Sequence, residues 1–267
     1  MLKFISRILA VNILASVASV ASVASVASEA RATEAKPTIV LVHGAFADSS
    51  SWNGVVSLLT GSGFNVVAAA NPLRGVASDA EYLASLARSI AGPVVLVVHS
   101  YGGAVVSPAA IGLGIVKALV FVAAFAPDQG ESALALAGKF PGSTLGAALA
   151  APVELPDGGK DLYVQQAKFP QQFAADVPLA QAKAMAATQR PIRAAALEEA
   201  LHDPAWKSIP SWAIYGTADL NIPSQAMSFM AERAKARKTI VIKDGSHALM
   251  VSHPANVAAL IREAAGS

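Results

Sequence analysis

The sequence predicts an α/β protein with a mainly parallel, doubly wound sheet. Runs rich in β-branched residues recur from Thr38 onward, and stretches with helical character separate them. This alternation is typical of a parallel sheet that helices cover on both faces. The chain has 267 residues, 54% of them hydrophobic, which is enough to bury one large core.

Six strands are expected. They cover Thr38–His43, Asn65–Ala70, Pro93–His99, Lys117–Phe125, Ser211–Gly216 and Lys238–Lys243. The segment Ser78–Glu81 has the pattern of a capping box and predicts a helix in the second crossover. Pro254 suits the first turn of a final helix that runs to about Ala265.

The alternation breaks between about Asp128 and Pro210, in a stretch rich in Ala, Gln, Pro and Phe. No buried strand is evident there, and the stretch is too long for a plain loop. We therefore expect an insertion at about 128–210 that forms a small helical cap. It should lie over the carboxyl edge of the sheet, where α/β sheets bind ligands.

Residues 1–32 have the features of a signal peptide. Lys3 and Arg7 precede a long apolar run, and Ala30-Arg31-Ala32 is a small-x-small cleavage site. The sequence thus predicts an exported protein, periplasmic or secreted, whose single domain covers residues 33–267 and which has no stable membrane association after cleavage. The alternative is an uncleaved anchor, because the run is long enough to span a bilayer.

The composition excludes several classes of function. The chain has no cysteine, which rules out disulfides, thiolate metal sites and a cysteine nucleophile. Three of its 20 Lys and Arg residues and one of its 18 Asp and Glu residues lie in the leader, so the mature chain is expected to be neutral. The chain lacks the cluster of Lys and Arg that is typical of proteins that bind nucleic acid, so we expect no nucleic-acid partner. We also expect neither a metal nor a cofactor.

Ser100 is the candidate nucleophile. The apolar strand that ends at His99 runs directly into Ser100-Tyr101-Gly102-Gly103 and then into a predicted helix. A nucleophile elbow needs this strand-turn-helix context, in which a sharp turn lifts the serine oxygen clear of the sheet. Gly102 keeps the second glycine of the G-x-S-x-G pattern, whereas Val98 replaces the first, which leaves open how the turn accommodates a branched side chain. The alternative is a serine that simply ends a strand.

The serine needs a base and an orienting acid. His247 follows the last strand in Asp244-Gly245-Ser246-His247, and Asp219 follows the preceding strand in Gly216-Thr217-Ala218-Asp219. Asp244 is the rival acid, but its place close to His247 suits a turn residue better. The chain order Ser, Asp, His distinguishes α/β-hydrolases from other triad folds.

The other four histidines are expected to have lesser roles. His43 and His99 each end a strand and should be hydrogen-bonded structural residues, while His202 should be solvated and His253 should start the last helix.

The segment His43-Gly44-Ala45-Phe46 follows the first strand and predicts an oxyanion loop. The backbone N–H groups of Ala45 and Tyr101 are the expected oxyanion donors, because both should face the reacting carbon. The serines at 49–51 are expected to cap a helix.

With these motifs the chain resembles the α/β-hydrolase superfamily, in particular bacterial esterases and the branch of plant methylesterases and hydroxynitrile lyases. The resemblance extends from Thr38 to the C-terminus and includes Ile222-Pro223 and Ser252-His253-Pro254. It implies the α/β-hydrolase fold, with a cap inserted after the sixth strand in the family's count. Relatives with lyase activity carry lysine directly after the catalytic histidine, where this chain has Ala248. That difference favours ester hydrolysis.

The sequence as a whole predicts a serine hydrolase that cleaves esters or lactones of small to medium apolar substrates through an acyl-enzyme. Rival interpretations are a lyase or cofactor-free oxygen chemistry on the same scaffold, and a non-catalytic protein that binds a small molecule. The oligomeric state is not indicated. Side chains expected to line an apolar substrate pocket are Phe46, Trp52, Phe125, Tyr163, Phe169 and Met185.

Overall fold

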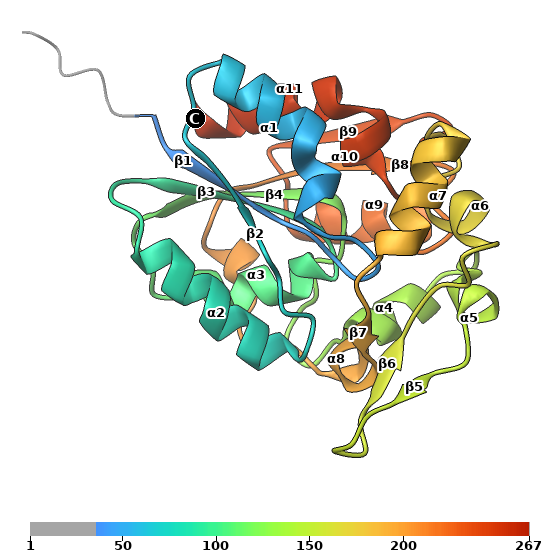
Figure 1. The fold of residues 1–267 in the computed structure, drawn as a ribbon. Helices are drawn as coiled ribbons and strands as arrows, with labels where there is room; N and C mark the ends of the chain where they lie inside the picture. The colour runs from blue at the N-terminus through green and yellow to red at the C-terminus, as the bar shows by residue number, and fades with distance from the viewer. Residues whose placement is uncertain (1–35, 267) are drawn as a thin grey trace, which may run out of the picture. The chain divides into compact units, whose positions relative to one another are not determined.

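A computed structural model of the protein describes residues 36–266 (Figure 1). The predicted signal peptide, residues 1–32, lies outside the described residues. Within 36–266, no helix combines the length and the apolar character needed to cross a membrane.

The core of the fold is a six-stranded sheet in the order β2-β1-β3-β4-β8-β9, with every pair of neighbours parallel. The strands are β1 (Thr38–Val42), β2 (Val66–Ala69), β3 (Val94–Ser100), β4 (Val116–Ala124), β8 (Ser211–Gly216) and β9 (Lys238–Ile242). All residues of β1, β3 and β8 are buried, whereas the edge strands β2 and β9 are partly exposed. Strands buried on both faces explain why the predicted runs are continuously apolar and not alternating.

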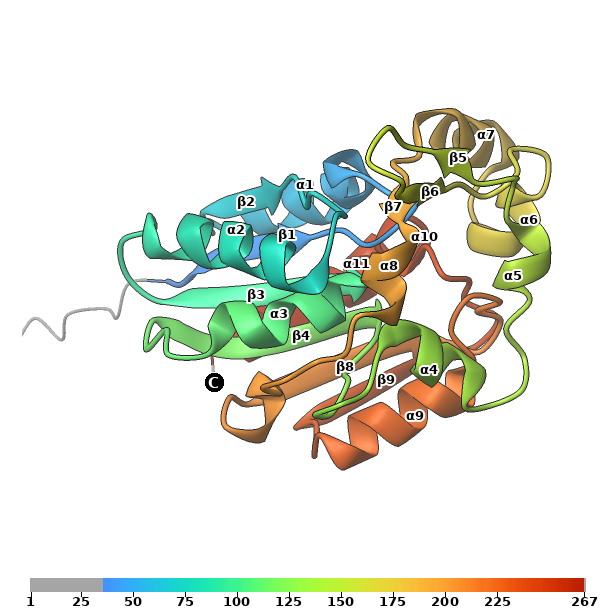
Figure 2. The same cartoon turned by 90° about the horizontal axis from the view of Figure 1, so that it is seen from below.

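Helices cover both faces of this sheet, which confirms the predicted doubly wound class (Figures 1 and 2). One face carries α1 (Asn53–Gly61) and α11 (Pro254–Ala265), which contact each other. The other face carries α2 (Val76–Arg88), α3 (Gly102–Ala110) and α9 (Ser224–Arg233). The short helices η1 (Ser49–Trp52) and α10 (Leu249–Ser252) follow β1 and β9.

The capping box predicted for α2 is wrong, although the helix itself exists. The helix begins at Val76, and the Ser78 hydroxyl donates to the Gly75 carbonyl instead of capping the first turn. The Glu199 carboxylate accepts from the backbone N–H groups of Val76 at 2.6 Å and Ala77 at 2.9 Å. A carboxylate distant in sequence thus satisfies the helix N-terminus, where negative charge is favoured.

The segment between β4 and β8 covers the carboxyl end of the sheet (Figure 2). We expected this insertion to be helical. Besides helices, it contains three very short strands that pair antiparallel in the order β5-β6-β7. Its elements are α4 (Ala133–Gly138), α5 (Leu145–Ala148), β5 (Val153–Glu154), β6 (Lys160–Leu162), α6 (Phe169–Phe173), α7 (Leu179–Thr188), β7 (Ile192–Arg193), α8 (Ala194–Glu198) and η2 (Ala205–Lys207). We call this segment, residues 128–210, the cap.

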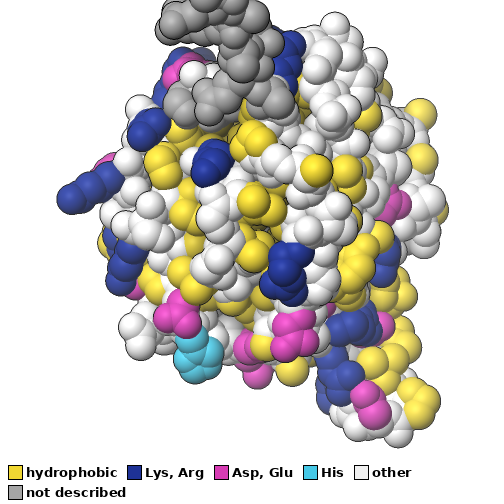
Figure 3. Space-filling view, turned by 90° about the vertical axis from the view of Figure 1, so that its left-hand side faces the viewer, with side chains coloured by type: hydrophobic (Ala, Val, Ile, Leu, Met, Phe, Trp, Pro, Cys, Tyr) yellow, Lys and Arg dark blue, Asp and Glu magenta, His cyan; other side chains and the backbone are white. Residues whose placement is uncertain are grey.

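Charged side chains of both signs are spread over the surface. On the face shown in Figure 3, Lys and Arg side chains are scattered among acidic, hydrophobic and uncharged ones.

Candidate active site

Ser100 occupies a strained turn between β3 and α3. Its φ of 53° is in the left-handed region, which non-glycine residues seldom adopt, and it is 7% exposed. A Cβ on Gly44 would lie 2.6 Å from the Ser100 Cβ, and a Cβ on Gly103 would clash with the Phe125 carbonyl. The turn therefore depends on these two glycines for its close approaches.

Val98 lies in β3, two residues before Ser100. Its side chain is fully buried in the sheet, where Val98 pairs with Val42 on one side and Phe121 on the other. The branched side chain thus takes part in the core of the sheet, and the turn at Ser100 forms with valine at this position.

Asp219 and His247 form a buried pair. The Asp219 Oδ2 atom lies 2.6 Å from His247 Nδ1, and both side chains are almost completely shielded from solvent. The other oxygen, Oδ1, accepts from the backbone N–H groups of Asn221 at 2.8 Å and Ile222 at 2.9 Å. Three hydrogen bonds thus hold the carboxylate, which in turn fixes Nδ1–H as the donor and leaves Nε2 of His247 as the basic nitrogen.

The rival acid Asp244 lies elsewhere. It is exposed, has a φ of 58°, and its backbone N–H donates to the Thr217 hydroxyl at 2.8 Å. These are the features of a turn residue.

Two further buried histidines, His43 and His99, lie at the carboxyl ends of β1 and β3. His43 Nδ1 donates to the Gly44 carbonyl at 3.0 Å and Nε2 accepts from the Asn71 backbone N–H at 3.1 Å, while burial lowers the His43 pKa to about 4. His99 Nε2 lies 3.0 Å from the His247 carbonyl, and their rings are 4.6 Å apart. Burial, followed by proximity to His247, lowers the His99 pKa well below its usual value. Both rings are therefore neutral at pH 7, so neither adds a positive charge beside His247.

The loop after β1 runs beside the Ser100 turn. Ala45 is buried, and Phe46 has a φ of 60° while its backbone N–H donates to the Arg190 carbonyl at 3.0 Å. The backbone N–H groups of Ala45 and Tyr101 donate to no other residue within 36–266. Both are consequently available as donors to a bound group.

The Tyr101 side chain anchors the elbow to α2. Its hydroxyl donates to Asp79 Oδ2 at 3.0 Å, and Asp79 is completely buried. Burial raises the Asp79 pKa despite hydrogen bonds from the Arg74 backbone and Tyr101, and burial likewise raises the pKa of Tyr101. The phenol thus remains protonated and positions the turn.

Ser100 and His247 line the same cavity of about 50 Å³. The Ser100 hydroxyl makes no hydrogen bond to another residue that the structure describes. The hydrogen bond between a catalytic serine and its histidine often becomes short only when substrate binds. The lining residues are Ala45, Phe46, Ser100, Tyr101, Phe125, Ala133, Leu134, Ala137, Leu145, Leu197, Asn221, Ile222 and His247.

Of the six side chains expected to line the substrate pocket, Phe46 and Phe125 line this cavity and four do not. Trp52 and Phe169 are fully buried in the core, and Phe169 stacks on Phe173 at 4.8 Å. Tyr163 is half-buried in the cap, and Met185 lines a separate small hollow beside Phe46. Large apolar side chains in the cap serve its packing, whereas the cavity wall uses smaller alanine and leucine residues from α4, α5 and α8.

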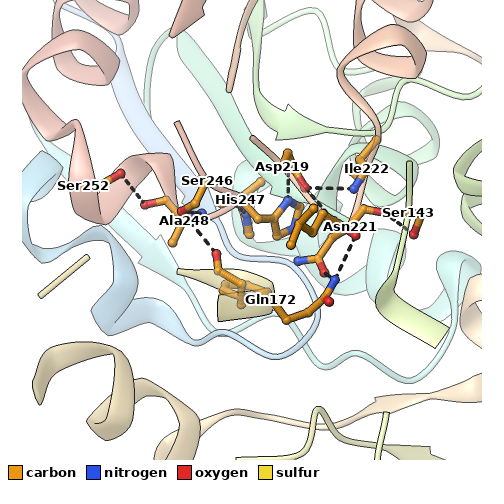
Figure 4. Close-up of polar contacts among 12 residues, drawn as sticks. Ser143, Gln172, Asp219, Asn221, Ile222, Ser246, His247, Ala248 and Ser252 are labelled. Atoms are coloured by element: carbon orange, nitrogen blue, oxygen red, sulfur yellow. Dashed lines mark hydrogen bonds and ion pairs between the residues drawn. The ribbon is translucent and has the colours of Figure 1, made fainter. Parts of the chain in front are cut away.

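The cap also supplies groups that the sequence did not identify. Phe173 from α6 packs edge-on against the His247 ring at 4.9 Å. Gln172 donates to the Leu220 carbonyl and to Asn221 Oδ1, both at 2.8 Å, which holds the loop of Asp219 (Figure 4). Asp176 accepts from the backbone N–H and the hydroxyl of Ser246, next to the histidine. These contacts join residues far apart in sequence, and no local motif marks them.

Within residues 36–266, no group of three or more His, Asp or Glu side chains is placed to hold a metal ion.

Several solved structures share this fold. Polyneuridine aldehyde esterase is 20% identical, with a TM-score of 0.74 over 86% of this chain and 99% of that chain. An extracellular alpha/beta-hydrolase from a Paenibacillus species is 24% identical, with a TM-score of 0.68 over 85% and 98% of the two chains. A pyrethroid hydrolase from Sphingobium faniae JZ-2 is 20% identical, with a TM-score of 0.68 over 86% and 98%.

No curated protein matches the sequence significantly. The model of the family described as "Alpha/beta hydrolase family", however, matches residues 39–260. This range includes every residue of the site described above. The chain therefore belongs to the alpha/beta hydrolase family.

Proposed function

We propose that the chain is a serine hydrolase that cleaves carboxylic esters or lactones of small to medium apolar substrates. The observation that supports this most strongly is the buried Asp219–His247 pair at 2.6 Å, whose histidine lines the same cavity as Ser100. Ser100 is held at a φ of 53° at a strand-to-helix turn. A strained backbone conformation at a serine that follows a strand and precedes a helix is typical of a nucleophile elbow.

In the proposed acylation step, Ser100 Oγ attacks the acyl carbon while His247 Nε2 takes the hydroxyl proton. Asp219 stabilises the imidazolium through Nδ1–H. The N–H groups of Ala45 and Tyr101 bind the resulting oxyanion. The bond from the acyl carbon to the alcohol oxygen then breaks, and Nε2–H returns the proton to the departing alkoxide.

A water molecule reverses the sequence in deacylation. His247 Nε2 removes its proton as the oxygen attacks the acyl carbon, and the bond to Ser100 Oγ breaks with return of the proton to the serine. Each oxyanion donor contributes about 3 kcal/mol of transition-state stabilisation in well-studied serine hydrolases.

The cavity supports an uncharged, mainly apolar substrate, because most of its lining side chains are alanine, leucine, isoleucine or phenylalanine. The buried methyl group of Ala248 follows His247 and supplies no cation there. This favours ester hydrolysis over the lyase alternative.

Rapid-mixing hydrolysis of p-nitrophenyl butyrate tests the proposal. We expect a burst of p-nitrophenol with an amplitude near one per chain if deacylation is slower than acylation, and trapping of the acyl group on Ser100 after acid quench. A burst whose acyl group is trapped on a residue other than Ser100 would refute the mechanism through Ser100. A chain that hydrolyses no ester would refute the function.

We also propose that residues 1–32 direct export and are removed, as their charged start and Ala30-Arg31-Ala32 indicate. N-terminal sequencing of protein recovered from expressing cells should show a start near Thr33 outside the cytoplasm. An intact Met1 in a membrane fraction would instead establish an anchor.

A further inference from the structure

The backbone of Asn221, two residues after Asp219, is fixed on both sides. Its N–H donates to Asp219 Oδ1 at 2.8 Å, and its carbonyl accepts from the Ser143 hydroxyl at 2.9 Å (Figure 4). The residue is 3% exposed and lines the cavity that contains Ser100 and His247. Its side chain therefore has a defined starting point in the cavity wall.

The orientation of the Asn221 amide is set by a chain of hydrogen bonds. Gln172 Nε2 lies 2.8 Å from the Leu220 carbonyl, which can only accept, so this atom of Gln172 is a donor. The same Nε2 lies 2.8 Å from Asn221, whose contacting atom must consequently be the acceptor Oδ1. Gln172 Oε1 accepts from the Thr144 hydroxyl at 2.8 Å, which agrees with this assignment. The opposite atom of Asn221 is thus the –NH₂ group, Nδ2.

Asn221 Nδ2 is buried and has no hydrogen-bond partner among the residues that the structure describes. Burying an amide donor without a partner is unfavourable, so such groups are rare. The other polar side chains of the cavity are accounted for, because Ser100 and His247 belong to the proposed chemistry and Tyr101 is bound to Asp79. Asn221 is thus a cavity-lining residue whose uncharged amide donor is buried and unpaired.

We propose that Asn221 Nδ2 donates a hydrogen bond to a second oxygen of the substrate, so that the preferred esters carry a carbonyl or ether oxygen besides the ester group. Asn221 is then a specificity-determining residue. The inference rests on the proposed ester hydrolysis for the identity of the substrate, but the donor itself can be tested without turnover. A site built around such a donor disfavours the analogue that lacks the acceptor, because the donor stays unpaired.

The first test compares matched esters. Phenyl 4-oxohexanoate and 5-oxohexanoate are compared with phenyl hexanoate for the acyl side, and 4-oxopentyl acetate with pentyl acetate for the alcohol side. We expect kcat/KM to be about 10-fold higher for the oxo ester in at least one of the two series. Equal values throughout both series would overturn the proposal.

Two variants connect that preference to the donor. Asn221→Leu keeps four side-chain heavy atoms branched at Cγ and has no donor, so the ratio of oxo to plain ester should fall to about one. Asn221→Asp keeps the acceptor for Gln172 and replaces the donor with an oxygen, so it should disfavour the oxo ester even if the leucine variant folds poorly. The control, Ser143→Ala, loosens the same loop without removing the donor, and should change both esters by the same factor. A preference that survives both Asn221 variants would overturn the proposal.

A binding measurement separates this inference from the proposed function. Cyclohexanone and methylenecyclohexane have the same shape, but only the ketone accepts a hydrogen bond. By calorimetry on full-length mature protein carrying Ser100→Ala, the ketone should bind about 10-fold more tightly, and Asn221→Leu added to this protein should remove the difference. If the protein without these substitutions hydrolysed no ester, that result would support the donor while the proposed function failed. Equal binding of the two ligands in an active esterase would do the reverse.

Discussion

The sheet and the cap are held together in different ways. In the sheet, β1, β3 and β8 are buried along their whole length, and each buried aliphatic side chain contributes about 1.5–3 kcal/mol. In the cap, the strands have only two or three residues each, and polar side chains make many of the connections. Arg74, for example, joins the cap through Asp161 at 2.8 Å and the Pro191 carbonyl at 3.0 Å.

This difference assigns separate tasks to the two regions. The sheet positions Ser100, Asp219 and His247 at the ends of its strands, while the cap closes the cavity and clamps the loops that carry them. Gln172, Ser143 and Asp176 are cap residues that form hydrogen bonds to these loops. Chemistry should therefore depend on the sheet, and substrate choice on the cap and the loops it holds.

The largest effect is expected at the proposed nucleophile, Ser100. Ser100→Ala should lower kcat for ester hydrolysis by about 10⁶-fold, as for removal of a triad serine elsewhere. Thermal unfolding should be nearly unchanged, because the substitution removes one hydroxyl that makes no hydrogen bond within 36–266. Activity that persists in a purified variant would move the nucleophile away from the end of β3.

The second effect separates the two carboxylates. Asp219→Asn should lower kcat by about 10⁴-fold, because His247 loses the acceptor that fixes its tautomer. Asp244→Asn, in an exposed turn, is the matched control and should leave kcat unchanged. The opposite ranking in steady-state assays would mean that the acid comes from the turn after β9.

The third prediction divides the cap into its packing and its cavity wall. Phe169→Ala should destabilise the protein by about 3–5 kcal/mol in denaturant unfolding, since it empties a fully buried site. Leu145→Ala enlarges the cavity and should shift discrimination between ester chain lengths by about 1–3 kcal/mol. If Phe169→Ala alone reordered the relative kcat/KM values, the cavity would not be the substrate pocket.

The smallest effect concerns the clamp at Asp176. Burial acts to raise the pKa of Asp176, but hydrogen bonds from the Ser246 hydroxyl and N–H outweigh it and lower the pKa below its usual 3.8. A lowered pKa stabilises the fold above pH 3.8, and this contribution is lost as the pH falls through the lowered value.

Asp176→Asn should accordingly reduce the free energy of unfolding by about 1 kcal/mol at pH 7. The difference from wild type should shrink below about pH 4. Denaturant unfolding of both proteins across pH 3–7 measures it. A difference that stays constant over this range would show that the carboxylate charge is not what holds Ser246.

The sequence predicted the sheet better than the cap for a physical reason. A strand such as Val94–Ser100 is buried on both faces and shows as one apolar run, and the loops after such strands must meet at one edge. Strands of two residues such as Ile192–Arg193 have no such pattern.

The same reason explains why four of the expected pocket residues do not line the cavity that contains Ser100. Large aromatic side chains such as Phe169 identify well-packed places, whereas a cavity is where large side chains are missing. The Asn221 donor was not predictable either, because its orientation depends on Gln172, 49 positions away in the sequence.

Covalent labelling tests the central claim most directly, namely that the end of β3 carries an activated serine. Mature protein treated with a fluorophosphonate and analysed by intact mass and peptide mapping should carry one adduct per chain, on Ser100. His247→Ala should slow the labelling strongly, and Ser100→Ala should abolish it. An adduct on another residue, or none under conditions that label a known serine esterase, would contradict the account.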